Sequence, residues 1–392
     1  MSKPDVTTHH DGPAAPWLAF GFLLAGLGTV LLGPILPDLS RLWTLTDAQS
    51  GILIGAKFFG AFLGGMTVPR RLRYGIFTGC LLGCLGFGAF ALSNSLVTGA
   101  MTLFVGGLGL GQIIASTNIL AGRRYRSHTG AALASLNFFW SLGAVTTGLL
   151  AAALMPRFHL RGPVLSFAAL FLLAGFGGLV HRSHRDAAAL DDEASTEKKL
   201  SAKVLLPFFG FLFLYGGLET CLTVWLPTYT QRFSDAQLLG GQSAAVLLWT
   251  ALTGGRIFAS AILRFVEEKI VQRIGLALSV VFIAVLAFTR HAPSLSLDCI
   301  LLGLSLAPFF PATFALLIKR GPTAREAGSV LAVSGLGAAL FPWLMGHIST
   351  FTGSLRSAMI VPLLLAVAMF ALSFWRDTPV PADDNKAQAS GV

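Results

Sequence analysis

The sequence contains few charged residues: they make up 12% of its 392 residues, whereas hydrophobic residues make up 54%. A soluble domain carries about 25% charged residues. Because the apolar residues also stand in long blocks, most of this chain must face lipid rather than water. The composition therefore excludes a soluble, disordered or collagen-like protein and predicts an all-α membrane protein.

Several motifs that carry chemistry are also missing. No G-x-x-x-x-G-K-[ST] loop is present to hold nucleotide phosphates, which argues against a built-in ATPase. No Ser–His–Asp order lies in a water-accessible segment. No third metal ligand accompanies Cys80 and Cys84, and the other two cysteines also lie in apolar blocks. We therefore expect neither an enzyme nor a cofactor or metal site.

Twelve apolar segments are each long enough to cross a bilayer as a helix. They lie at 17–37, 48–68, 74–93, 98–121, 130–153, 162–181, 204–227, 240–263, 270–289, 295–318, 327–350 and 355–375. The first is too long for the apolar part of a signal peptide. The expected organisation is a tail at 1–16, a six-helix bundle at 17–181, a polar linker at 182–203, a second six-helix bundle at 204–375 and a tail at 376–392.

The sequence holds 28 lysines and arginines against 18 acids. Basic loops that fix a membrane topology explain this excess better than nucleic-acid binding. With the N-terminus in the cytoplasm, 20 of the basic residues fall on the cytoplasmic side, six fall on the opposite side, and Lys57 and Arg256 fall inside spans. This bias predicts that both termini are cytoplasmic.

The two halves share short matches at a nearly constant offset, which indicates an internal duplication. The pairs are FGFL at 20–23 and 209–212, Leu36-Pro37 and Leu226-Pro227, and DAQ at 47–49 and 235–237. A competing register aligns Gln49-Ser50 with Gln242-Ser243. Duplicated bundles that rock about a central site are typical of secondary transporters.

Charge inside a span is costly and usually faces a cavity or a partner. Glu219 is the only acid deep in a span, and Lys57 and Arg256 are the deep bases. At about 1.5 Å per residue, they lie about 22, 16 and 10 Å from the cytoplasmic helix ends. These depths favour a Glu219–Lys57 pair that forms in one gating state and breaks in another. They disfavour a Glu219–Arg256 pair, and separate contacts with water and backbone are the alternative.

Uncharged polar and aromatic residues in the spans are candidate solute contacts. Amides form paired hydrogen bonds with hydroxyls, and an indole offers a flat apolar face to a sugar ring. Contacts between helices or anchoring at the membrane interface are the alternative roles. The candidates are Gln112, Asn118, Asn137, Trp140, Trp225 and Tyr229.

The chain resembles the major facilitator superfamily over nearly its whole length, and in particular its fucose/glucose/galactose-type sugar transporter branch. The resemblance rests on NFFWSLGAVTTG (137–148), LYGGLETCLTVWLPTY (214–229), LWTALTGGR (248–256), GLSLAPFFPATFAL (303–316) and SGLGAALFPWLMG (334–346). It implies a helix-7 glutamate before a tryptophan, matched by Glu219 and Trp225. It also implies a Gly-Arg in helix 8, matched by Gly255 and Arg256, and a sugar-facing amide at Asn137.

Two features depart from this resemblance. The loop GGMTVPRRLRYG (64–75) lacks the aspartate usual between helices 2 and 3, and Gln112 stands where a helix-4 carboxylate is expected. Glutamine cannot exchange a proton. Proton coupling therefore either moves to Glu219 or is absent, which would leave a facilitator.

Together these observations predict a multi-pass, monomeric carrier in a bacterial inner membrane. It moves a small polar solute, a hexose-like sugar, by alternating access, with Glu219, Lys57 and Arg256 in coupling or gating. Two other transporters stay open: a proton-driven efflux pump for lipophilic compounds, and an organic-anion carrier that uses Lys57 and Arg256. A receptor on a transporter scaffold is a further alternative, although the short loops offer little effector surface.

Overall fold

A computed structural model describes residues 16–69, 72–124, 129–180, 200–236, 242–263 and 265–374. These residues form fifteen helices and no strand. The helices are α1 (Pro16–Val30), α2 (Leu32–Leu42), α3 (Asp47–Met66), α4 (Leu72–Leu92), α5 (Leu96–Arg124), α6 (Thr129–Phe158), α7 (Arg161–Val180), α9 (Ala202–Phe233), α10 (Ser243–Ile262), α11 (Glu268–Phe288), α12 (Ala292–Leu306), α13 (Phe309–Ile318), α14 (Ala324–Thr352), α15 (Leu355–Ala358) and α16 (Ile360–Leu372).

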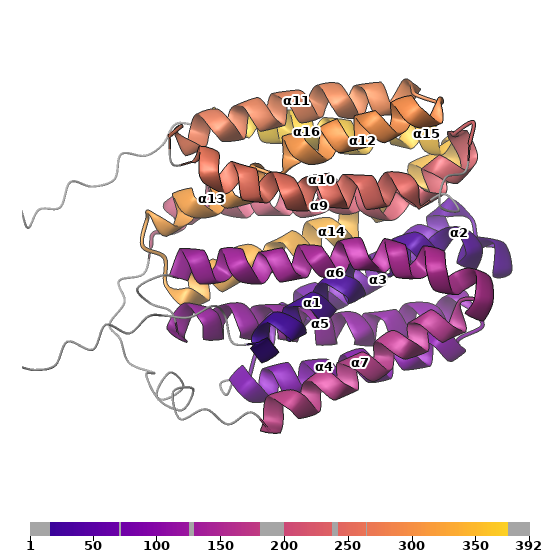
Figure 1. Cartoon of the computed structure of the whole chain (residues 1–392), viewed down its shortest axis with the longest axis horizontal. Coiled ribbons are helices and arrows are strands. Elements are labelled where there is room, and N and C mark those ends of the chain that lie inside the picture. The colour runs from indigo at the N-terminus through magenta and orange to yellow at the C-terminus, as the bar shows by residue number, and fades with distance from the viewer. Residues whose placement is uncertain are drawn as a thin grey trace, which may run out of the picture.

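Three successive pairs continue as single broken rods: α1 with α2, α12 with α13, and α15 with α16 (Figure 1). The described helices therefore form twelve rods, in agreement with the twelve predicted segments. Nine of the described helical segments are long and apolar enough to cross a membrane. Outside that set, α3 carries Asp47 and Lys57, and α7 and α10 have shorter apolar stretches.

Some helix ends differ from the sequence prediction. The predicted first and seventh spans end at Pro37 and Pro227, but the helices continue to Leu42 and Phe233. Proline is tolerated inside membrane helices, because neighbouring helices and side chains compensate the lost backbone hydrogen bond. As a result α9 has 32 residues, whereas α10 has 20.

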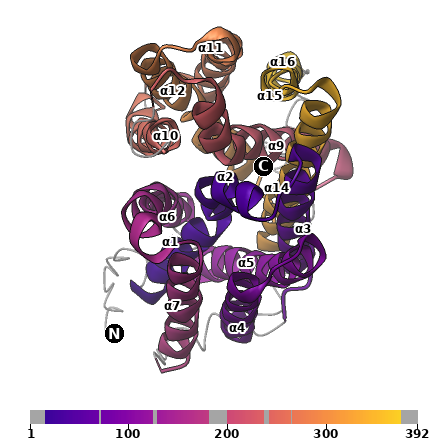
Figure 2. The same cartoon turned by 90° about the vertical axis from the view of Figure 1, so that its right-hand side faces the viewer.

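The helices lie roughly parallel, with α1 to α7 on one side and α9 to α16 on the other (Figures 1 and 2). Several helices make contacts between the groups: α14 packs against both α3 and α9, α2 packs against α9, and α6 packs against α10. We call the left-hand end in Figure 1, where α7 ends and α9 begins, the linker end. The opposite end, where α2 passes into α3, is called the far end.

Glycines hold α3 and α5 in close contact. A side chain on Gly107 of α5 would collide with the carbonyl oxygen of Lys57 on α3, and one on Gly60 of α3 would collide with that of Phe104 on α5. Small residues allow this backbone approach between membrane helices. The contact fixes the position of Lys57 relative to the centre of the molecule.

Candidate functional site

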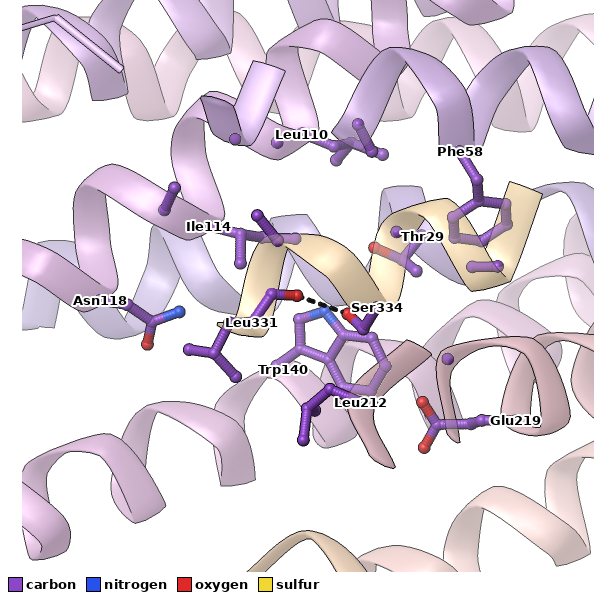
Figure 3. Close-up of a pocket in the computed structure, with 18 of the residues that line it drawn as sticks. Thr29, Phe58, Leu110, Ile114, Asn118, Trp140, Leu212, Glu219, Leu331 and Ser334 are labelled. Carbon is purple, nitrogen blue, oxygen red and sulfur yellow. Dashed lines mark hydrogen bonds between the residues drawn. The ribbon is translucent and has the colours of Figure 1, made fainter. Parts of the chain in front are cut away.

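A cavity of about 170 Å³ lies between the two groups of helices. Gly65, in the last turn of α3, and Gly328, near the start of α14, line it, so it reaches toward the linker end. Figure 3 shows Asn118 and Glu219 at opposite ends of the drawn group of lining side chains. An engineered cavity of about 150 Å³ accommodates benzene, so this volume suits a solute with one ring.

Glu219 and Arg256 form an ion pair at the wall of the cavity. The Nη2 atom of Arg256 lies 3.3 Å from Oε1 of Glu219, and the hydroxyl of Tyr215 donates to the same oxygen at 2.8 Å. Nη1 of Arg256 donates to Oγ of Ser141 at 2.5 Å. Because α9 carries Glu219, α10 carries Arg256 and α6 carries Ser141, this network joins the two groups of helices.

The predicted Glu219–Lys57 pair is not formed in this conformation, and Glu219 pairs with Arg256 instead. The sequence-based depths were counted from the helix ends. At about 1.5 Å per residue, α9 is about 48 Å long and α10 about 30 Å, so at most one pair of their ends can lie at the same depth. The 3.3 Å contact between the two side chains shows that counting from the ends misplaces Glu219 relative to Arg256.

Lys57 is completely buried and lines the cavity. Its Nζ donates to the carbonyl oxygens of Thr29 at 2.5 Å and Gly28 at 3.4 Å, and it lies 4.5 Å from the ring centre of Phe58. These carbonyls belong to the last turn of α1, which ends at Val30. A cation is favoured there because the carbonyl oxygens of a helix point toward its C-terminal end and give that end a partial negative charge.

Three of the six predicted solute contacts line the cavity: Asn118, Asn137 and Trp140. Asn118 is 9% exposed, and its Oδ1 atom is buried without a hydrogen-bond partner among the described residues. The indole of Trp140 lies among the lining side chains in Figure 3 and packs edge-on against Trp249, with ring centres 5.3 Å apart. The cavity thus combines an unsatisfied amide with an aromatic ring.

The other three candidates lie outside the lining residues and contact neighbouring helices. Gln112 accepts a hydrogen bond from Oγ1 of Thr78 on α4 at 3.0 Å. Trp225 donates to the carbonyl of Pro342 at 3.1 Å, and the hydroxyl of Tyr229 donates to that of Leu286 at 3.0 Å. The sequence could not separate these residues from lining residues, because almost every face of these helices is apolar.

Sequence reasoning missed four polar residues of the lining: Thr29, Tyr215, Thr220 and Ser334. Thr29 stands just before the break between α1 and α2, and Tyr215 stands one turn before Glu219. Ser334 donates to the carbonyl of Leu331 at 2.6 Å (Figure 3). The helix break and the turn spacing were the available signals for the first two.

A second ion pair joins the two groups at the far end, and the sequence analysis did not anticipate it. Arg232, at the end of α9, binds both carboxylate oxygens of Asp47 at 2.6 and 2.7 Å. Ser349 of α14 donates to Asp47 at 2.6 Å. We call Asp47, Arg232 and Ser349 the far-end latch. Beside it, the backbone N–H of Ala48 donates to Oγ1 of Thr350 at 2.8 Å.

Between the far-end latch and the cavity, α2 and α9 are also closely packed. Gly33 of α2 lies against the backbone of Thr223 on α9, and a Cβ there would lie 2.9 Å from the Thr223 carbonyl oxygen. The amide of Gln242 donates to the carbonyl of Pro34 at 2.9 Å. The cavity is therefore closed toward the far end and extends toward the linker end.

A central cavity between two groups of apolar helices, closed at one end by contacts between the groups, is the arrangement of a secondary transporter. The family model described as Major Facilitator Superfamily matches residues 18–335. The chain belongs to this superfamily, and it is a transporter rather than an enzyme. Among the described residues, no group of three or more His, Cys, Asp or Glu side chains could hold a metal ion.

Individual transporters also match this chain in sequence or in fold. The L-fucose-proton symporter of Escherichia coli (strain K12) is 24% identical, and the match covers 91% of each chain. The niacin transporter NiaP of Acinetobacter baylyi is 29% identical over 147 residues, a match that spans only 34% of that transporter. The solved structure of the xylose transporter XylE from E. coli has a TM-score of 0.73 at 12% identity and covers 92% of this chain and 97% of that one.

Proposed function

We propose that this protein carries a small polar solute, a hexose-like sugar, across the membrane by alternating access. The observation that carries the proposal is the cavity, which is closed at one end. It holds the Asn118 amide oxygen, buried without a partner among the described residues, together with the indole of Trp140 and an ion pair. Amides recognise hydroxyl groups, and an indole face fits the apolar side of a sugar ring. The L-fucose-proton symporter, matched over 91% of each chain, supports the same solute class.

In this proposal the segments 17–181 and 204–375 are the two bundles that rock against each other. The linker end is cytoplasmic, because the basic residues gather in the segments expected there. The conformation described here is then open toward the cytoplasm and closed by the far-end latch. A bacterial inner membrane is the location that suits these relatives, and we propose that the carrier works as a monomer.

Glu219 is the proposed coupling acid. A proton on its carboxylate removes the charge that faces Arg256, and Arg256 also holds Ser141 of the first bundle. Protonation therefore changes the contact between the bundles at the cavity wall, which links proton binding to rocking. A carrier that moves its solute without protons is the alternative, and in it the same pair acts only as a gate.

Solute uptake into proteoliposomes tests the proposal. Labelled hexoses are offered with and without an imposed pH gradient, to the wild type and to Glu219→Gln. Uptake that follows the gradient in the wild type but not in Glu219→Gln supports coupling at Glu219. Gradient-independent uptake supports a facilitator. A wild type that takes up neither a hexose nor a hexose-derived sugar acid refutes the sugar proposal.

The efflux pump and the organic-anion carrier remain the competing functions. A volume of about 170 Å³ is small for the bulky lipophilic compounds of an efflux pump. One specific observation favours the organic-anion carrier: two positively charged side chains, Lys57 and Arg256, line the cavity. Flux of a hydrophobic drug or of an aromatic carboxylate in the same liposomes distinguishes these two functions.

A further inference from the structure

The charges of the cavity do not balance. Among the described lining residues, Lys57 and Arg256 carry positive charge and Glu219 carries negative charge. Glu219 is already paired with Arg256 at 3.3 Å. With all three side chains ionised, the cavity therefore has one positive charge in excess, and that charge belongs to Lys57.

The surroundings of Lys57 only partly compensate this charge. Within the described residues its contacts are two backbone carbonyl oxygens and the ring of Phe58, which carry partial charges only. No described carboxylate lies within ion-pair distance of its Nζ. An ammonium group has three donors, and two of them are accounted for by Gly28 and Thr29. A buried charge in a membrane protein is costly and marks a pathway or a partner.

We infer that the solute itself supplies the missing negative charge: it is a sugar acid, a ring or chain with several hydroxyl groups and one carboxylate. This inference rests on the proposed transport function and refines its solute class. The carboxylate accepts the third donor of the Lys57 ammonium, while the contacts with Gly28 and Thr29 hold the ammonium in place. One carboxylate brings the total charge of the loaded cavity to zero.

The remaining lining residues fit the hydroxyl groups of such an acid. Asn118 offers its unsatisfied Oδ1 atom as an acceptor, and the Asn137 amide and the Ser334 hydroxyl line the same cavity. A purely aromatic carboxylate would leave the Asn118 oxygen buried without a donor, which is unfavourable. The polar lining thus favours a polyhydroxylated acid over an aromatic one.

The test compares sugars that differ only in one carboxylate. Purified wild-type protein is tested for binding and counterflow with D-glucose against D-glucuronate and with D-galactose against D-galacturonate. We expect the acid of each pair to compete at least tenfold better than its neutral partner. In Lys57→Met this preference falls at least tenfold, whereas Lys57→Arg keeps it.

The control is Lys319→Met, which removes an equal charge from an exposed pair with Glu268 outside the cavity, and it should leave the preference unchanged. Neutral sugars that compete as well as the acids overturn the inference while the proposed transport function stands. An equal loss of preference in Lys319→Met also overturns it. If neither acids nor neutral sugars bind or move, the proposed function falls together with the inference. The wild-type comparison decides even where Lys57→Met does not fold.

Discussion

The far-end latch makes a quantitative prediction about the balance between conformations. Asp47→Asn keeps the size of the side chain but removes the charge that binds Arg232. The interaction of Asp47 with the N-terminus of its own helix is present whether the far end is open or closed, so its loss largely cancels. What the substitution removes selectively is the contact between the two groups of helices, which exists only when the far end is closed.

The size of the effect follows from the geometry and exposure of the pair. Asp47 is 10% exposed and Arg232 is 41% exposed, so solvent screens the pair on one side. Exposed ion pairs contribute about 0.2–1 kcal/mol, whereas hydrogen bonds to charged groups contribute about 1.5–3 kcal/mol. A half-buried bidentate pair lies between these values, at about 1–2 kcal/mol, which corresponds to a factor of about 5–30 in the ratio of closed to open molecules.

Cysteine labelling measures this ratio. Thr223 is 4% exposed and its backbone packs against Gly33, so a cysteine at position 223 becomes reachable from the far end only when α2 and α9 separate. The four native cysteines are first replaced. At low reagent concentration the labelling rate is proportional to the open fraction. We expect Asp47→Asn and Arg232→Gln each to raise that rate about 5- to 30-fold.

Arg41→Gln provides the matched control, because it breaks an exposed pair with Asp38 inside α2 at the same end and leaves the contact between the groups intact. An unchanged labelling rate in Asp47→Asn would show that the latch does not hold the far end closed. A rise of equal size in Arg41→Gln would show that the effect comes from general surface charge. The exchanged pair Asp47→Arg with Arg232→Asp should restore part of the wild-type rate.

Three further predictions concern packing and the cavity. Gly107→Ala forces a methyl group against the backbone of α3, so it should lower the stability of the folded protein by about 1–3 kcal/mol, measured as a lower melting temperature. Gly254→Ala is the control and should leave the melting temperature unchanged, because a Cβ there meets nothing within 4 Å. Trp225→Phe removes one hydrogen bond between helices, so it should cost about 1 kcal/mol in stability and leave solute affinity unchanged in a binding titration. Asn118→Ala should weaken solute binding at least fivefold in that titration. Gln112→Leu, outside the lining residues, should leave affinity within twofold. Equal losses of affinity in the two variants would contradict this placement of the cavity.

The number of membrane rods could be predicted from sequence because it depends on one strong signal, the length of each apolar segment. The breaks at Leu31 and before Phe309 could not be placed, because a helix that changes direction keeps its hydropathy. The predicted first and seventh spans end at Pro37 and Pro227, although both prolines lie inside helices. Proline alone does not mark an end where neighbouring helices compensate the lost hydrogen bond.

The site was harder to predict than the rods for a related reason. In a soluble helix the polar face identifies the solvent side, but here both lipid-facing and core-facing sides are apolar, so periodicity could not separate Asn118 from Gln112. Charge was a better guide, since Lys57, Glu219 and Arg256 all line the cavity. Their pairing depends on how α9 and α10 lie against each other, which sequence spacing within one helix does not contain.

The glycine contacts between α3 and α5 have a mechanical consequence. Backbones that touch at Gly60 and Gly107 leave no layer of side chains to deform, so these two helices move as one stiff lever. A spectroscopic label on the outer surface of α5 therefore reports the displacement of α3, which carries both Asp47 of the latch and Lys57 of the cavity. Because α3 moves as a rigid body, a displacement of Asp47 at the latch also displaces Lys57 in the cavity, without any change in the conformation of α3.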